Sequence, residues 1–157
     1  TGLAGGEVEL EMQAFFPEGQ KQLELGFRLR FPELPEELAL EAVVPFEVPV
    51  LNLARGQGAE LTGEQAGGGS VAETLEGEQV ERLYTGACFR LRPSRGGPAL
   101  VLASCARSGV LVLRVRTART RRGLRLLASP YGAHFPAPAR LYSGRTLSFC
   151  LRLGLED

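Results

Sequence analysis

The chain has 157 residues and no net charge, because 18 acidic residues balance 18 basic ones, and 44% of the residues are hydrophobic. This length is enough to bury one core without disulfides or metals, and the hydrophobic content excludes an intrinsically disordered chain. No stretch approaches the roughly 20 uninterrupted apolar residues of a membrane-spanning helix. We therefore expect a single domain over residues 1–157, and because the sequence does not begin with methionine we expect this domain to be a fragment of a longer protein.

The first predicted elements are two strands joined by a tight turn. Apolar residues alternate with glutamates over residues 7–12 and with polar residues over residues 22–31, which predicts two strands that each bury one face. The intervening Pro17 and Gly19 are typical of turns. These two strands should therefore pair as a hairpin.

The next segments are an extended stretch and a glycine-rich one. Residues 45–53 have the composition of a strand, but Pro45 and Pro49 cannot donate backbone hydrogen bonds and confine it to a sheet edge or a bulge. Residues 54–69 are expected to form a flexible glycine-rich loop. Its end, "AGGGS" at residues 66–70, fits either a natural loop or an engineered linker.

Two short helical turns are predicted on either side of this loop. Residues 36–43 follow Pro35 and begin with glutamates, the residue types that favour a first helical turn. Residues 71–82 follow Ser70, which stands three positions before Glu73 as in a capping box.

The second half of the chain returns to alternating patterns, which predict five further strands. Together with the first half they give about eight short strands separated by Gly and Pro turns. This is the pattern of an all-β fold, and we expect an antiparallel β-sandwich with one or two short helical turns. The five strands cover residues 87–92, 99–106, 111–116, 124–128 and 147–155. The core is predicted to contain Phe27, Leu29, Phe89, Leu113, Phe149 and Leu151.

The residues that most enzymes need are scarce. His134 is the only histidine and stands in a proline-flanked loop without a neighbouring carboxylate, so a Ser-His-Asp triad is not supported. Cys105 is a conceivable nucleophile with His134 as its base, but its apolar neighbours favour an inert, buried side chain. One histidine and three scattered cysteines do not form a zinc pattern. We therefore predict no enzymatic activity, no cofactor and no metal.

The cysteines also bear on the compartment. Cys88, Cys105 and Cys150 are an odd set without close spacing, which differs from a disulfide framework. The only asparagine, Asn52, is not part of a glycosylation motif. These observations predict three free thiols and a cytoplasmic or nuclear location.

Charge is strongly segregated along the sequence. Residues 1–81 carry 16 Glu against one Lys and three Arg, a net charge of −12, whereas residues 82–157 carry 14 Arg against two acidic residues, a net charge of +12. The basic half contains "RVRTARTRRGLR", residues 114–125, at the expected turn between two strands. Guanidinium groups at such a tip are suited to bind carboxylates or phosphates. The predicted partner-binding residues are Arg119, Arg121, Arg122 and Arg125.

Three interpretations of this charge pattern remain open. The arginines pair with glutamates of the acidic half within the fold, or they bind an acidic protein, or they bind nucleic acid or anionic lipid. Nucleic-acid binders usually have a net basic domain with interleaved aromatic residues, which this chain lacks. We predict a non-enzymatic protein–protein interaction module, or scaffold, of a larger intracellular protein that binds an acidic partner through the arginine-rich hairpin. A coat-like jelly-roll assembly subunit is the alternative, with oligomerisation through its oppositely charged faces.

Overall fold

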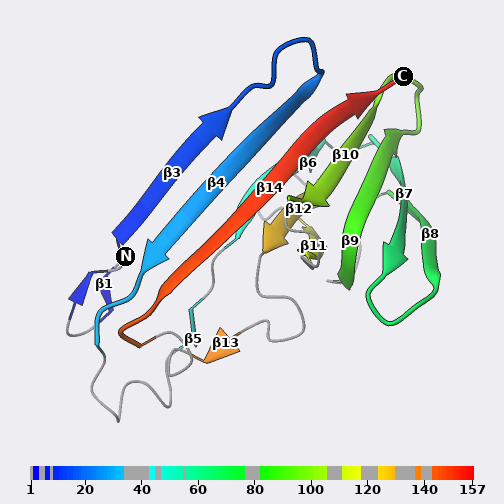
Figure 1. Ribbon diagram of the computed structural model, residues 1–157. Coiled ribbons are helices and arrows are strands. Elements are labelled where there is room, and N and C mark those ends of the chain that lie inside the picture. The colour runs from blue at the N-terminus through cyan, green and yellow to red at the C-terminus, as the bar shows by residue number, and fades with distance from the viewer. Residues whose placement is uncertain are drawn as a thin grey trace.

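The protein is described by a computed structural model that covers residues 2–3, 6–7, 9–33, 43–44, 47–54, 56–76, 82–105, 111–117, 124–129, 137–138 and 143–157. Every regular element within these residues is a β-strand, and the strands pair antiparallel (Figure 1). No helix in this part of the chain has the length and apolar content to cross a membrane.

Fourteen strands occur in the described residues. They are β1 (Gly2–Leu3), β2 (Gly6–Glu7), β3 (Glu9–Phe15), β4 (Gln22–Arg30), β5 (Val43–Val44), β6 (Val48–Leu53), β7 (Ala59–Gln65), β8 (Ser70–Leu75), β9 (Arg82–Pro93), β10 (Ala99–Ser104), β11 (Leu111–Thr117), β12 (Leu124–Ser129), β13 (Ala137–Pro138) and β14 (Thr146–Glu156). The pairs β1–β2 and β5–β13 stand apart from the main sheet.

The other ten strands form one hydrogen-bonded network in which β9 is the branch point. The order is β3-β4-β14-β10-β9-β11-β12-β6, while β7 lies along the other edge of β9 and is followed by β8. One edge of β9 is shared, because its residues 88–91 pair with β10 and its residues 82–86 pair with β11. Beyond β9 the network therefore divides into two leaves, one through β10 and β14, the other through β11 and β12.

The two leaves pack face to face as a β-sandwich. Strands β6, β11 and β12 lie behind β10 and β14 in Figure 1. Side chains from both leaves meet in a single buried cluster, which contains Leu151 and Phe89 from one leaf and Leu113 and Leu126 from the other. The predicted all-β, antiparallel sandwich is confirmed.

A bulge explains how β9 takes part in both leaves. Tyr84 and Gly86 point inward, and so does Phe89, but Ala87 and Cys88 are both exposed, so the alternation slips by one residue. The register with β7 shifts at the same place and leaves Ala87 without an opposite residue. An extra residue of this kind bends a strand and increases its twist, which turns β9 from one leaf toward the other.

The predicted core is found largely as expected. Phe27, Leu29, Phe89, Leu113 and Leu151 are buried. Phe149 is partly buried and stacks on Phe27, with 4.6 Å between the ring centroids. Stacked rings on neighbouring strands add to the energy of apolar burial.

The sequence predictions for the hairpin and the edge strand are also confirmed. Strands β3 and β4 pair antiparallel across a turn in which Gly19 has a φ of 72°. Strand β6, with Pro49, lies at the end of the strand order and its register with β12 is irregular.

Two predictions for the middle of the chain are wrong. Strand β8 occupies the start of the helical turn expected at residues 71–82, and strand β7 lies inside the glycine-rich loop expected at residues 54–69. Tertiary pairing explains both, because β7 joins β8 to the long strand β9 and each residue gains ladder hydrogen bonds. Of the other helical turn, expected at residues 36–43, only Val43 is described, and it belongs to β5.

Candidate functional site

Ion pairs on the sheet surface neutralise most of the arginines that lie on described strands. Five pairs join carboxylate and guanidinium groups on neighbouring or nearby strands, and the sixth joins the Lys21 ammonium to Asp157 just outside the ends of β4 and β14. Three pairs join the acidic half of the sequence to the basic half. The pairs are Lys21–Asp157, Arg28–Glu11, Arg30–Glu9, Arg82–Glu73, Arg90–Glu156 and Arg152–Glu24. Intramolecular pairing therefore accounts for part of the charge segregation, and among the described side chains it leaves strand arginines such as Arg92 and Arg125 without a carboxylate partner.

The predicted arginine hairpin is formed by β11 and β12. These strands pair from Val112 opposite Ser129 to Thr117 opposite Leu124. Residues 118–123 connect them in the sequence and lie outside the described residues, and so do Arg119, Arg121 and Arg122. Of the four predicted partner-binding residues, the structure describes Arg125.

Arg125 lies opposite another arginine. In the register of the hairpin its Cα partner is Arg116 on β11, and its partner on the other side is Asn52 of β6. Like charges directly opposite each other in a sheet are destabilising. The Nε atom of Arg125 is buried and has no hydrogen-bond partner in the described part of the chain. Arg125, close to the end of the hairpin where residues 118–123 connect the two strands, therefore has no carboxylate partner among the described residues.

The cysteines differ from the prediction of three free thiols. Cys105, at the end of β10, forms a disulfide with Cys150 on β14, and the amide of Cys105 donates a hydrogen bond to the carbonyl of Cys150. The prediction is wrong because strand pairing brings together two cysteines that are 45 residues apart in the sequence. Disulfides are rare in reducing compartments, so the cysteines no longer support a cytoplasmic or nuclear location.

Cys88 is the free cysteine in the described residues, and it is exposed on β9. Partial burial of its sulfur raises the pKa of the thiol, since removing the thiolate from water is unfavourable. A thiol with a raised pKa carries little of the reactive thiolate at neutral pH. Cys88 therefore has no feature of a catalytic nucleophile.

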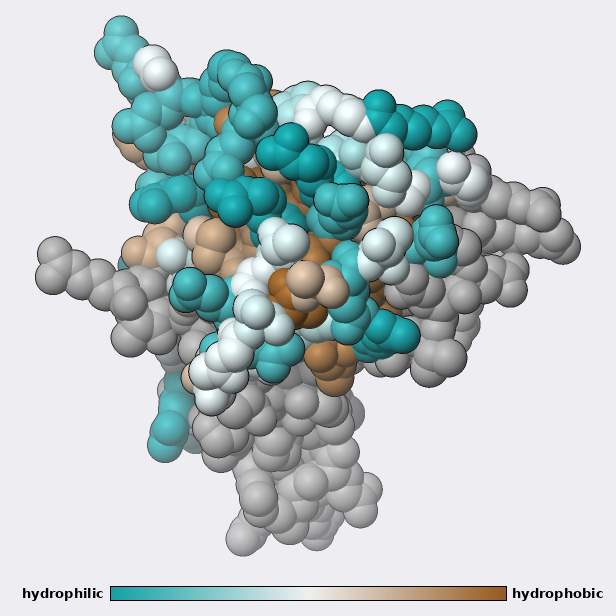
Figure 2. Space-filling model, turned by 90° about the vertical axis from the view of Figure 1, so that its right-hand side faces the viewer, coloured by the Kyte–Doolittle hydropathy of each residue, from teal (hydrophilic) through white to brown (hydrophobic). Residues whose placement is uncertain are grey.

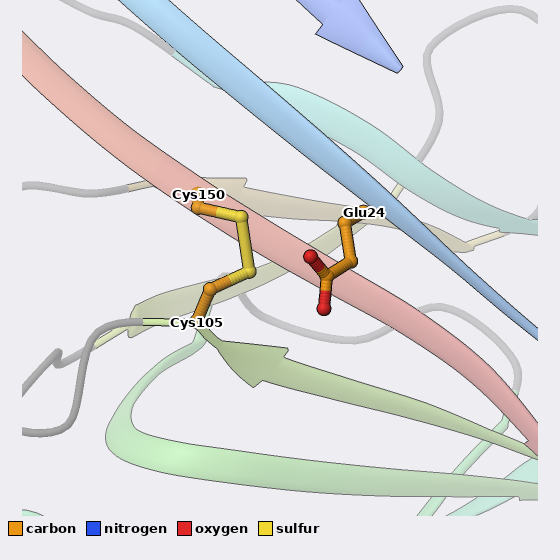
Figure 3. Close-up of side chains that lie close together, drawn as sticks. All are labelled: Glu24, Cys105 and Cys150. Atoms are coloured by element: carbon orange, nitrogen blue, oxygen red, sulfur yellow. A yellow bond between two sulfur atoms is a disulfide. The ribbon is translucent and has the colours of Figure 1, made fainter. Parts of the chain in front are cut away.

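Glu24 lies beside the disulfide, with its carboxylate directed toward the two sulfur atoms (Figure 3). These three residues have the donor types of a metal site, but sulfurs joined in a disulfide are not thiolate ligands. The Glu24 carboxylate also accepts hydrogen bonds from Arg152, with a shortest nitrogen–oxygen distance of 2.7 Å. The cluster is best explained as a cross-link between β10 and β14 beside a cross-strand ion pair.

A shallow depression of about 420 Å³ adjoins the disulfide on the outer face of the same leaf. The depression lies at Gly26, which has no side chain to fill it. In the strand register Gly26 is paired with Gln13 on one side and with Cys150 on the other. Glu11, Arg28 and Ser148 also line it. Its acidic and basic groups pair with each other, so the depression offers hydroxyl and amide groups but no base aligned with a nucleophile.

A second cluster around a carboxylate joins the edge strand β8 to the long strand β9. The Tyr84 hydroxyl donates a hydrogen bond of 2.7 Å to Glu73 on β8, and Arg82 forms an ion pair with the same oxygen. Tyr84, together with Arg82, holds the pKa of Glu73 below its ordinary value, while burial raises the pKa of Tyr84. Both groups keep their usual charge state at neutral pH, so this cluster is structural rather than acid–base machinery.

Sequence reasoning missed the features that depend on pairing. The Cys105–Cys150 bridge and the Glu73 cluster both join strands that are separate in sequence. His134, the one histidine, lies outside the described residues.

No family model, no curated protein and no solved structure matches this chain.

Proposed function

We propose that this domain is a non-enzymatic protein–protein interaction module that binds an acidic partner through the β11–β12 hairpin. The observation that carries the proposal is the position of Arg125, opposite Arg116 and without a hydrogen-bond partner for its buried Nε in the described residues. Strand arginines elsewhere, such as Arg90 and Arg152, have carboxylate partners. Two arginines at opposite positions of a ladder are expected to repel, and a cost to stability of this kind is common at binding sites.

The chemistry of the hairpin favours carboxylate ligands. The sequence adds three arginines between β11 and β12, and Arg125 follows where β12 begins. Guanidinium groups bind carboxylates through two parallel hydrogen bonds, and closely spaced guanidinium groups select a ligand with several negative charges. An acidic protein segment supplies such a row of carboxylates.

Binding to a poly-glutamate peptide, measured by isothermal titration calorimetry, tests this proposal. The variant Arg119→Glu/Arg121→Glu/Arg122→Glu should bind the peptide at least about tenfold more weakly, because interface arginines are frequent binding hot spots. Its unfolding free energy should change little, since exposed charges contribute roughly 0–1 kcal/mol each.

A control variant with the same change in net charge separates a site from general attraction. Arg92, Arg95 and Arg145 are exposed arginines away from the hairpin, and their triple reversal to Glu should leave peptide binding largely intact. Equal losses in both variants would contradict the proposal. If a single-stranded oligonucleotide or phosphatidylserine vesicles bound much more tightly than the peptide, the partner would be nucleic acid or lipid and not an acidic protein.

A further inference from the structure

The described part of the sheet network ends in three edge strands, β3, β6 and β8. An edge strand presents unpaired backbone N–H and C=O groups, which can pair with a strand from another chain unless the sequence prevents it. Proteins commonly protect such edges with proline, bulges, short length or charges that point inward. These features distinguish the three edges.

Two of the edges carry such protection. Strand β6 contains Pro49 and has an irregular register with its neighbour. On β8, Glu73 lies on the same face as the buried Val71 and Leu75, so it is an inward-pointing charge. The side of the molecule that carries β7 and β8 is mainly hydrophilic in its described part, with only small hydrophobic areas (Figure 2).

Strand β3 lacks these features. It runs for seven residues without proline, glycine or a bulge, and every one of its side chains is exposed. In the described residues its one partner strand is β4. Leu10 and Met12 are 54% and 60% exposed, although they lie on the same face as the buried core residues of β4. An apolar row therefore continues from the core onto an edge that no described strand covers.

The pairing of β3 with β4 shows which kind of strand β3 accepts. On the outer face, Glu9 lies opposite Arg30 and Glu11 opposite Arg28, with nitrogen–oxygen distances of 3.7 and 3.5 Å. On the inner face, Leu10 and Met12 lie opposite apolar residues of β4. The carboxylates of Glu9 and Glu11 remain largely exposed, so each can approach a second cation on its other side.

We propose that the free edge of β3 binds an extended segment of a partner protein in which Arg or Lys alternates with apolar residues. This segment adds an antiparallel strand next to β3. Backbone hydrogen bonds then provide affinity, and side chains that alternate between the two faces provide specificity. Basic residues lie beside Glu9 and Glu11, and apolar residues cover Leu10 and Met12.

A second copy of this chain fits the edge less well. Two β3 strands paired antiparallel, with matching faces, place Glu11 opposite Glu11 or opposite Glu9 in two of the available registers. Like charges directly opposite each other are destabilising. The register centred on Met12 avoids direct contact, but it still brings two acidic strands together without a cation between them. Charge complementarity therefore favours a basic partner strand.

Binding of a synthetic peptide tests the proposal directly. The peptide carries the sequence of residues 23–31, which alternates apolar residues with Arg28 and Arg30, and the control peptide has Glu at both arginine positions. The first peptide should bind at least about tenfold more tightly and should slow hydrogen exchange of the β3 amides. Methylation of alternate backbone nitrogens in the peptide should abolish binding, because the added ladder needs those donors.

A charge swap on the domain gives a second test. The variant Glu9→Lys/Glu11→Lys should reverse the preference and bind the Glu peptide more tightly than the Arg peptide. The hairpin triple reversal should bind the Arg peptide as the wild type does, which separates this site from the proposed acidic-partner site. Equal binding of both peptides, protection at strands other than β3, or a dimer in light scattering that protects β3 without peptide would each overturn the proposal.

Discussion

Phe89 and two glycines show how single residues determine the path of β9. Phe89 is fully buried, and its ring lies over Gly63 on β7 and near Gly86 on its own strand. A Cβ atom at Gly63 would lie 2.7 Å from Cδ1 of Phe89 and 2.8 Å from the carbonyl oxygen of Cys88. A Cβ atom at Gly86 would collide with the carbonyl oxygen of Glu64. Glycine at these positions thus permits both the aromatic packing and the close approach of the strands at the bulge.

The substitution Gly63→Ala should therefore destabilise the domain. Extra atoms in a packed core usually cost about 1–3 kcal/mol, and here the neighbours that must move are a buried ring and a backbone carbonyl. Gly26→Ala is the matched control, because the nearest atom to its Cβ would be 3.9 Å away. Urea unfolding should show a clear loss for the first variant and little loss for the second. Equal effects would show that strand glycines matter here only through backbone entropy.

Residue patterns predicted much of the core but not these contacts. Alternation alone identifies Phe27, Leu29 and Leu151 as inward-facing, because each occurs in an unbroken strand pattern. Gly63 interrupts the apolar row of β7, although Ala59 and Leu61 alternate with Glu60 and Thr62. That alternation indicates a strand at β7, but the neighbouring glycines favoured the prediction of a loop.

At the scale of the elements, β8 shows why a helix signal and a strand signal can coincide. Val71 and Leu75 are four residues apart, a spacing that places them on one face of a helix and also on one face of a strand. The Ser70 and Glu73 pattern then favours a helix start. In the structure the Glu73 carboxylate instead binds Tyr84 and Arg82 on β9, a strand with which β8 does not itself pair. Long-range pairing of this kind has no local sequence signal.

The Glu73 cluster should make the stability of the domain depend on pH. The pKa of Glu73 is lowered in the fold from an ordinary value of 4.5, so its charged form is favoured by folding. This contribution is present at neutral pH and is lost as the pH falls below 4.5 through the lower folded pKa. Glu73→Gln should be less stable than the wild type at pH 7, and the difference should shrink as the pH falls below 4.5.

Tyr84→Phe provides the control for that measurement. The Tyr84 hydroxyl is the main cause of the lowered pKa of Glu73, so its removal should reduce the effect of Glu73→Gln at pH 7. Urea unfolding at pH 7 and at pH values below 4.5 would measure these differences. If the unfolding free energies of the wild type and of Glu73→Gln depended on pH in the same way, this would contradict the assigned role of the Glu73 carboxylate.

At the scale of the whole molecule, the disulfide joins the structure close to the point where the two leaves separate. Strand β10 ends at Ser104, beside Cys105, and β11 resumes pairing with β9 at Leu111. Cys105 is fixed there to β14, which continues the first leaf. Neither the division of the network nor the cysteine pairing could be predicted, because both depend on which strands become neighbours rather than on the pattern within any strand.

Reduction of this disulfide should destabilise the domain by about 2–4 kcal/mol, the usual range for a bridge that constrains the unfolded chain. Denaturing alkylation should add one label, at Cys88, without reductant and three labels after reduction. Cys88→Ser should leave the unfolding free energy nearly unchanged. Three labels in the absence of reductant would show that the bridge does not form in solution.

The sequence predicted the arginine hairpin as an element but not the feature that distinguishes it. Alternation and the arginine run locate two strands, and β11 and β12 confirm them. That Arg116 and Arg125 are register partners follows only from the pairing, and the acidic residues that neutralise other arginines are likewise placed by the topology. Which charges remain for a partner is therefore a property of the whole fold.

Hydrogen exchange of the domain with and without a poly-glutamate peptide is the most direct test of the hairpin as a binding site. The proposed function predicts slower exchange confined to residues 111–129, no change in β3, and loss of this protection in the variant Arg119→Glu/Arg121→Glu/Arg122→Glu. Protection spread over all basic surfaces, or protection at residues 111–129 that survives the triple reversal, would contradict it.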